Sequence, residues 1–233
     1  MRLEGFLRRQ LKESLLVVTQ VSTRKRLFYL AIKRIMDMIV SALALILLSP
    51  ALAVVALLIR LDSPGPAIFK QTRIGKNGMP FTFYKFRGMF VDARERFPEL
   101  YDYTYTPEEL ETLFFHQIND PRVTRIGRII RKTAIDELPN FINVLKGDMS
   151  LVGPRPEIPE LVAYYGPIER KALSVRPGIT SLPKVQGRDG LNFRETLDLD
   201  LYYVENQSLL LDLRILLKTV KVVFSMEGMV RNG

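Results

Sequence analysis

The chain has 233 residues, of which 47% are hydrophobic, and it contains no cysteine. This length is enough for one large or two small domains whose core needs no metal or disulfide. The lack of cysteine excludes disulfides, zinc-thiolate sites and a cysteine nucleophile. The formal net charge is +9, and residues 1–34 hold nine Lys/Arg against two glutamates. A basic N-terminal arm of this kind can meet nucleic acid or anionic lipid.

Residues 1–30 are predicted to form a basic amphipathic extension. Between residues 3 and 22, apolar side chains recur at helical spacing, and Arg8, Arg9 and Lys12 lie among them. This pattern is typical of a helix that lies in a membrane interface.

Residues 31–62 contain the predicted membrane segment. Residues 38–59 are 22 consecutive residues without charge, about 33 Å if helical and so long enough to cross a bilayer. The run and its basic lead-in are too long for a cleavable signal peptide. Ser49-Pro50 lies at the middle, where proline removes a backbone donor and predicts a bend.

Basic residues flank both ends of this segment, so the positive-inside rule places both ends on the cytoplasmic face and favours a re-entrant hairpin. A straight span with an ordinary proline kink is the alternative. From the residues alone the two arrangements are about equally supported.

Residues 63–233 are predicted to form a cytoplasmic domain at the membrane surface. Ser63-Pro64-Gly65-Pro66 should end the helix, and residues 67–74 and 81–89 read as two strands of a β-hairpin. Thr106 begins a helix-start signature with proline and glutamate after it. Thr124 can cap a short helix that runs through Lys132.

A pair of carboxylates, Asp136 and Glu137, lies within a frame of cations. These cations are Arg125, Arg128, Arg131, Lys132, Lys146 and Arg155. Surface ion pairs alone contribute only ~0–1 kcal/mol each. The concentration of positive charge around two adjacent acids therefore indicates that phosphate is handled here.

Pro139 fixes where the helix after the pair begins. Proline is tolerated only in the first turn of a helix, so Asp136 is expected at or next to the N-cap. The apolar residues of this segment predict one buried stripe; they are Leu138, Phe141, Ile142 and Leu145. Gly147 should end the helix.

Two roles for Asp136 compete. As a plain N-cap it would contribute ~1 kcal/mol. However, the neighbouring arginines and the rigid Gly153-Pro154-Arg155-Pro156 can hold phosphate, and a carboxylate among such cations can attack phosphorus. Its charge would repel a pyrophosphate unless a divalent cation bridges them, so Asp136 is also a predicted ligand of Mg²⁺.

Three further features are less specific. Residues 209–226 predict a long helix with a basic stripe, suited to a membrane surface or to packing on the core. Pro177-Gly178 predicts a type II turn beside Arg176, which can reach a phosphate. The only histidine, His116, is expected to be structural, and no nucleic-acid-binding module is present.

The run IRKTAIDELPNFINVLKGDMSLVGPRP, which ends at Pro156, resembles the signature of the bacterial sugar transferases, the small monotopic phosphoglycosyl transferases. The resemblance covers roughly residues 31–222. It also includes Lys33-Arg34 with Asp37, Ser49-Pro50, Gly65-Pro66, Gln71-Thr72-Arg73-Ile74-Gly75, Tyr84-Lys85-Phe86, Arg176-Pro177-Gly178-Ile179-Thr180, and Asp200 with Tyr202-Tyr203.

The resemblance implies a covalent mechanism. Asp136 would attack the β-phosphate of a UDP-sugar, release UMP and carry the phosphosugar until a polyprenyl phosphate, such as undecaprenyl phosphate, accepts it. Glu137 would orient the site and assist proton or metal handling, while Lys85, Arg131 and Arg155 would bind phosphates. The resemblance also implies a re-entrant helix in the bacterial inner membrane, with the catalytic domain on the cytoplasmic face.

Three departures from the family pattern stand out. Many relatives read Gly-Trp-Ala-Gln-Val-Asn-Gly-Arg where residues 181–188 read SLPKVQGR, which leaves the sugar open. Arg87-Gly88-Met89 replaces a more usual basic-Thr-Met. Residues 92–119 are longer than in minimal members and could form a lid or partner surface.

Together these features predict a helix-rich α+β fold with a re-entrant membrane hairpin, amphipathic surface helices and a small β-hairpin. A large parallel sheet is not expected because βαβ alternation is missing. The predicted function is the first membrane step of bacterial glycoconjugate synthesis. The alternative is a non-catalytic membrane scaffold of a glycan-assembly complex, whose cations bind anionic lipid or a partner of that complex. The final glycan, the polyprenol length and a homodimer stay open.

Overall fold

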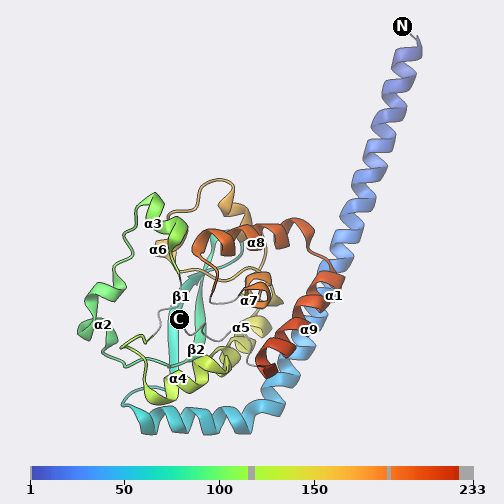
Figure 1. The fold of residues 1–233 in the computed structure, drawn as a ribbon. Helices are drawn as coiled ribbons and strands as arrows, with labels where there is room; N and C mark the ends of the chain where they lie inside the picture. Colours follow the sequence, from blue (N-terminus) through green and yellow to red (C-terminus); the bar gives the residue numbers. More distant parts are fainter. Residues whose placement is uncertain (1, 115–118, 188–189, 226–233) are drawn as a thin grey trace. The chain divides into compact units, whose positions relative to one another are not determined.

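The computed structural model describes the backbone of residues 2–114, 119–187 and 190–225, and the side chains from residue 24 to residue 223 within these ranges (Figure 1). His116 and Arg188 lie outside the described residues. The fold is helix-rich with two small sheets, which confirms the predicted α+β class.

By its contacts the chain divides into two units, residues 1–36 and 37–233. The first unit is the N-terminal part of helix α1 (Arg2–Asp62). The second contains the rest of α1 and all the other elements. This division does not test the predicted one into residues 1–30, 31–62 and 63–233.

Helix α1 contains the apolar segment. Its part Arg24–Asp62 is long and apolar enough to cross a membrane, by length and composition. Pro50 lies inside the helix and cannot donate to the carbonyl of Ile46. The hydroxyl of Ser49 donates to that carbonyl instead, at 2.8 Å. The backbone therefore stays helical past the proline, and the re-entrant hairpin remains a prediction.

The helix stops at Asp62, as Ser63-Pro64-Gly65-Pro66 predicts. A helix end leaves carbonyl groups without partners, and the buried Arg87 binds them. Its guanidinium donates to the carbonyls of Ser63 at 2.7 Å, of Ile59 at 3.4 Å and of Pro64. Asp62 in turn accepts a bond from the backbone N–H of Ile126 at 3.0 Å, which joins the end of α1 to helix α4 (Arg125–Lys132).

Strands β1 (Ile68–Ile74) and β2 (Pro80–Phe86) form the predicted antiparallel hairpin. The connecting turn η1 (Lys76–Gly78) uses positive φ at Asn77 and Gly78. Strand β2 ends before the predicted residue 89 because the chain turns toward α4 there. The carbonyl of Gly88 accepts a bond from the N–H of Thr124 at 3.1 Å.

A second, parallel pair was not predicted: β3 (Ser150–Val152) lies beside β4 (Gly178–Thr180). Gly178 has no positive φ, so the predicted type II turn at Pro177-Gly178 is wrong. The glycine is needed for a different reason, since a Cβ atom at Gly178 would overlap the backbone of Gly153.

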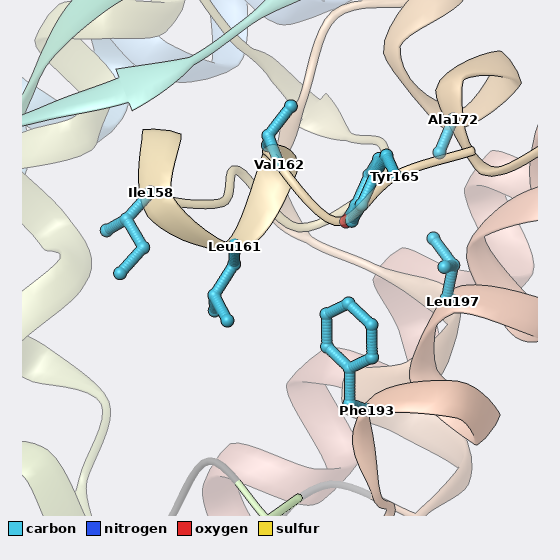
Figure 2. Packing of buried hydrophobic residues seen from close by; sticks show 7 residues of the cluster. All are labelled: Ile158, Leu161, Val162, Tyr165, Ala172, Phe193 and Leu197. Carbon is cyan, nitrogen blue, oxygen red and sulfur yellow. The ribbon is translucent and has the colours of Figure 1, made fainter. Parts of the chain in front are cut away.

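Residues 92–114 are built into the domain. They form α2 (Ala93–Arg96), η2 (Pro98–Tyr101) and α3 (Pro107–Thr112), and α3 begins with the predicted capping box of Thr106 and Glu109. Tyr103, Tyr105 and Leu110 pack against a hydrophobic core, and Figure 2 shows the seven buried residues of that core. That core belongs to α6 (Pro159–Val162), η4 (Glu169–Ser174) and α8 (Phe193–Asn206). A lid or partner role stays a prediction.

The C-terminal helix α9 (Leu209–Ser225) follows the predicted range. Its buried Ile215 packs in a core with β3, with α8 and with α7 (Leu182–Gln186). Its basic residues Arg214, Lys218 and Lys221 are exposed. Exposed apolar side chains lie among them, with Leu217 at 72% exposure.

Candidate active site

The two acids lie in a short 3₁₀ helix, η3 (Ile135–Asn140), between α4 and α5 (Phe141–Lys146). Its N-cap is Ala134, with a left-handed φ of 56°. The prediction that Asp136 is at or next to the N-cap is therefore wrong, because the tight turn after α4 starts the helix earlier. Regular α-helix begins only at Phe141, so Pro139 lies in the 3₁₀ segment before this helix and not in its first turn.

The predicted buried stripe on this segment is also wrong. Ile142 and Leu145 are 44% and 37% exposed, whereas Asn143 and Val144 are fully buried. The physical reason is a polar contact that hydrophobic spacing does not encode: the amide of Asn143 binds the backbone of β2.

The side-chain amide of Asn143 forms hydrogen bonds with the backbone of strand β2. Its Nδ2 donates to the carbonyl of Thr82 at 2.7 Å, and its Oδ1 accepts from the N–H of Tyr84 at 3.3 Å. Lys85 follows Tyr84 directly in β2. The same asparagine therefore fixes the strand that carries Lys85 against the segment that carries the acids.

Asp136 is buried, with 8% of its surface exposed. The Nζ of Lys85 lies 3.9 Å from its Oδ2. Burial and the neighbouring charge of Glu137 raise the pKa of Asp136, and Lys85 opposes them. Burial also lowers the pKa of Lys85, helped by the charges of Arg131 and Arg73.

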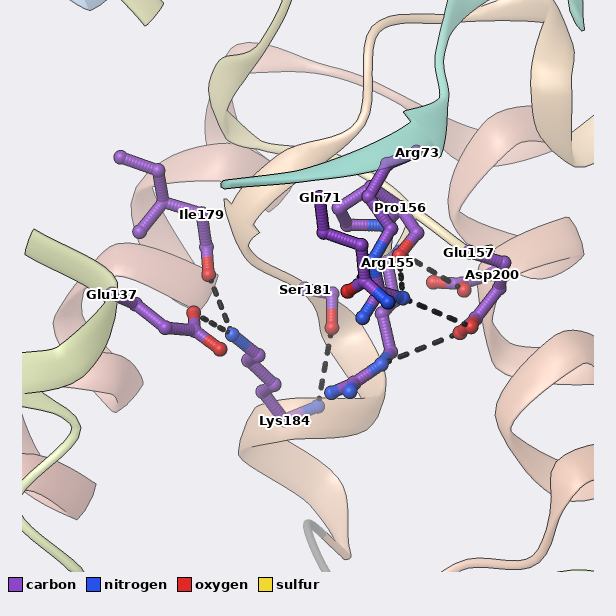
Figure 3. A network of polar contacts seen from close by, with 10 residues as sticks. All are labelled: Gln71, Arg73, Glu137, Arg155, Pro156, Glu157, Ile179, Ser181, Lys184 and Asp200. Carbon is purple, nitrogen blue, oxygen red and sulfur yellow. Dashed lines mark hydrogen bonds and ion pairs between the residues drawn. The ribbon is translucent and has the colours of Figure 1, made fainter. Parts of the chain in front are cut away.

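Glu137 has a different cation, Lys184 of α7. The ammonium of Lys184 contacts the carboxylate of Glu137 and donates to the carbonyl of Ile179 at 2.8 Å (Figure 3). Burial alone would raise the pKa of Glu137, but the charges of Lys184 and Arg155 outweigh it and hold this pKa below its usual range. The pKa values of the two adjacent acids are thus shifted in opposite directions, upward for Asp136 and downward for Glu137.

Arg131 reaches the site from the last turn of α4. Its Nη1 lies 3.9 Å from Oδ2 of Asp120, and its charge acts on both Asp136 and Lys85. Asp120 itself is held by two bonds from Arg122, each of 2.8 Å. Arg131 is therefore tethered beside the acids.

Arg155 is fixed by two buried carboxylates. Its Nε lies 3.3 Å from Oε1 of Glu157, and its backbone N–H donates to Oδ2 of Asp200 at 3.2 Å (Figure 3). Glu157 also holds Arg73, whose Nη1 lies 3.6 Å from its Oε2 and donates to the carbonyl of Pro156 at 3.0 Å. Burial raises the pKa of both Glu157 and Asp200.

The other predicted cations are placed differently. Nε of Arg176 donates to the carbonyl of Gly147 at the end of α5, at 2.7 Å, and its predicted phosphate contact stays a prediction. Lys146 pairs with Asp148 at 3.2 Å. The remaining three, Arg125, Arg128 and Lys132, are exposed on α4.

Two cations of the site, Lys184 and Arg73, were missed by the sequence analysis. Arg73 lies within the stretch Gln71-Thr72-Arg73-Ile74-Gly75 that carries the family resemblance, so a signal was present. Lys184 lies 47 positions from Glu137, and no local spacing connects them. Its only signal was the departure of residues 181–188 from the family pattern.

Within the described ranges, no group of three or more His, Asp or Glu side chains could hold a metal ion. A Mg²⁺ that keeps one protein carboxylate and takes its other ligands from substrate and water needs no such group. The 3.9 Å separation from Lys85 exceeds a hydrogen bond, and none of the described residues donates a hydrogen bond to the carboxylate of Asp136. The residues present fit this kind of site, with Asp136 rather than Glu137 as ligand.

Comparison with known proteins gives matches that include the residues of this site. A family described as "Bacterial sugar transferase" matches residues 28–226. "Galactosyl transferase CpsE" of Streptococcus agalactiae is 40% identical over 220 residues, 94% of this chain and 48% of that protein. "Exopolysaccharide production protein PSS" of Rhizobium leguminosarum is 43% identical over 206 residues, 82% of this chain and 94% of that protein.

A third relative is named "UDP-glucose:undecaprenyl-phosphate glucose-1-phosphate transferase", from Caulobacter vibrioides. It is 42% identical over 196 residues, 81% of this chain and 68% of that protein. The chain spans less than half the length of several curated relatives, CpsE among them at 48%.

Proposed function

The chain belongs to the bacterial sugar transferase family, and we propose that it moves a sugar-1-phosphate from a UDP-sugar to undecaprenyl phosphate or another polyprenyl phosphate, releasing UMP. The names of relatives support this class of donor and acceptor. The structural observation that carries the proposal is the buried carboxylate of Asp136, which lies 3.9 Å from the ammonium of Lys85 and accepts no hydrogen bond from the described residues.

In the first half-reaction, an oxygen of Asp136 attacks the phosphorus that bears the sugar. The bond from this phosphorus to the bridging oxygen breaks, and UMP leaves with the electron pair. Lys85, Arg131 and Arg155 stabilise the charge that develops on the phosphoryl oxygens. Mg²⁺ bound at Asp136 would reduce the repulsion between carboxylate and pyrophosphate.

In the second half-reaction, a phosphate oxygen of the polyprenyl phosphate attacks the same phosphorus. The bond to Asp136 breaks, the carboxylate is restored, and the product is a polyprenyl diphosphate sugar. A phosphate monoester has a second pKa of about 6 and is largely deprotonated near neutral pH. The acceptor therefore needs little help from a base, and Glu137 serves mainly to orient the site.

The proposed location is the cytoplasmic face of the bacterial inner membrane. Residues 31–62 form a re-entrant hairpin that turns at Ser49-Pro50, and residues 63–233 rest on the membrane surface. The long apolar helix and the basic residues on both sides of it support this arrangement. The reaction would start the membrane-bound assembly of an exopolysaccharide, capsule, O-antigen or glycoprotein glycan, with the sugar left open.

The test measures UMP release by purified protein with undecaprenyl phosphate, Mg²⁺ and a panel of UDP-sugars. One of the sugars should give UMP, and Asp136→Asn should lower that rate by at least ~10³-fold because the nucleophile is lost. Asp198→Asn is the matched control, since the only partner of this exposed aspartate among the described residues is Arg194 on its own helix, 3.6 Å away. EDTA should abolish the activity and added Mg²⁺ restore it. UMP release at an unchanged rate by Asp136→Asn would rule out the proposed nucleophile.

A further inference from the structure

The backbone of Lys184 is held firmly in the fold. It lies in α7, whose N-cap Ser181 accepts a bond from the backbone N–H of Lys184 at 3.4 Å. The next two residues toward the N-terminus, Leu182 and Pro183, are buried. Leu182 packs in the core with Tyr203 and Ile215. The position from which the lysine side chain extends is therefore set by the fold.

The ammonium group of Lys184 has two acceptors. One is the carboxylate of Glu137, and the other is the carbonyl of Ile179 in β4, at 2.8 Å. The side chains of Lys184 and Glu137 are 28% and 25% exposed. Removing one partner from a largely buried ion pair leaves an uncompensated charge, which costs far more than an exposed pair would contribute.

The two acids are neighbours in the chain but have cations from different elements. Asp136 faces Lys85 of β2, whereas Glu137 faces Lys184 of α7. Figure 3 shows Glu137 extended toward Lys184 and Ile179. Because Glu137 is occupied in this way, Asp136 is the acid of the pair that stays open to a phosphorus atom.

We propose that Lys184 is a positioning residue of the phosphosugar transfer: it holds Glu137 against β4 and compensates its charge, so that Asp136 alone meets the incoming pyrophosphate. The inference rests on the proposed function. Without Lys184, the freed carboxylate of Glu137 would repel the donor and compete for the cations that bind it. Lys184 contacts no reacting atom: its ammonium group binds Glu137 and the carbonyl of Ile179.

The experiment is a double-mutant cycle read on the first half-reaction. Protein is mixed with the UDP-sugar and Mg²⁺ in the absence of polyprenyl phosphate, and the burst of UMP is timed. Lys184→Met should slow the burst by about 10-fold, within the range of roughly 2- to 150-fold that couplings between contacting residues correspond to. Lys184→Arg, which keeps the charge, should restore most of the rate.

The decisive variant is the double one. If Lys184 acts through Glu137, then Lys184→Met should change the burst by less than about 2-fold in a Glu137→Gln background. Purely multiplicative effects of the two substitutions would overturn the proposal, and so would a wild-type burst in Lys184→Met. If Lys184→Met fails to fold, judged by thermal unfolding, the cycle is completed with Lys184→Gln under the same criteria.

Lys171→Met is the matched control, because Lys171 is exposed on η4 and, within the described residues, its side chain has no partner. This variant should keep the wild-type burst. Failure of the wild-type protein to release UMP from any UDP-sugar would count against the proposed function itself. An active wild type with an additive cycle would count against the role of Lys184 alone.

Discussion

Asn140 and Asn143 lie one turn apart just after the acid pair, and both are fully buried. The amide of Asn143 binds the backbone of β2 on both sides, at Thr82 and Tyr84. The amide of Asn140 is different: within the described part of the chain, neither its Oδ1 nor its Nδ2 has a hydrogen-bond partner. Identical residues at similar burial therefore have opposite energetic roles.

We expect Asn143→Leu to lower the free energy of unfolding by about 2 kcal/mol, because it removes two part-buried hydrogen bonds, to the N–H of Tyr84 and to the carbonyl of Thr82. Asn140→Leu should be neutral or should raise the unfolding midpoint, since the apolar side chain removes polar atoms that have no partner. Thermal unfolding of both variants in the same detergent measures the difference. Equal losses in the two variants would contradict this interpretation.

At this scale the sequence predicted which charged residues lie near Asp136 better than it predicted which side chains they contact. Asp136 and Arg131 were predicted to lie in one site because they are a few residues apart in a basic stretch. Lys184 could not be found in this way, since only folding brings β4 and α7 to Glu137. The prediction that Ile142 and Leu145 are buried was wrong, because reading a buried stripe from hydrophobic spacing assumes that every exposed helix face meets water and is therefore polar. The buried face is taken instead by Asn143, whose amide serves β2.

At the scale of elements, the contact between α4 and the end of β2 places Arg131. A Cβ atom at Gly127 of α4 would overlap the carbonyl oxygen of Gly88. A Cβ at Gly88 would lie 3.3 Å from Cδ of Arg131. A side chain at position 88 would therefore require the Arg131 side chain to shift by a few tenths of an ångström.

Gly127→Ala should destabilise the protein by about 3 kcal/mol, since the added methyl group must push two backbones apart. UMP release should fall with it, because Arg131 lies one turn further along the same helix. Gly190→Ala is the matched control, because a Cβ there meets no atom of the described residues within 4 Å. An unchanged unfolding midpoint for Gly127→Ala would show that the backbones at Gly127 and Gly88 can move apart at little cost.

The helix boundaries were largely predictable because their signals are local. The capping box at Thr106, the cap at Thr124 and the glycine stop at Gly147 all form as expected. The end of α1 was predicted from its prolines, but the role of Arg87 there was not. Arg87 lies 24 residues after Ser63 in the chain, and no pattern of neighbouring residues predicts a contact between them.

At the scale of the molecule, exposed apolar side chains concentrate on helices. Only 6% of the most apolar window of α1 is buried. Exposed leucines and valines alternate with Arg214, Lys218 and Lys221 on α9, and Ile142 and Leu145 are exposed on α5. Apolar surface bordered by lysine and arginine suits an anionic membrane interface. This distribution supports a domain that rests on lipid.

The topology of the membrane segment is open to a direct test, because the chain has no cysteine that would need to be removed. Ser22→Cys and Lys76→Cys place single thiols before and after the segment, the second on the exposed turn of the β-hairpin. A membrane-impermeant maleimide is added to inside-out and to right-side-out vesicles. The hairpin predicts that both thiols are labelled only in inside-out vesicles, since basic residues hold both ends in the cytoplasm.

The same assay shows whether Pro50 causes the turn. Pro50→Leu gives the uncharged residues 38–59 a regular helix that is long enough to cross the bilayer. We expect part of the Lys76→Cys protein that also carries Pro50→Leu to be labelled in right-side-out vesicles, with UMP release lowered in proportion. Opposite labelling of the two thiols in protein that keeps Pro50 would contradict the hairpin. It would also place Asp136 on the far side of the membrane from the nucleotide sugar that we propose as its donor.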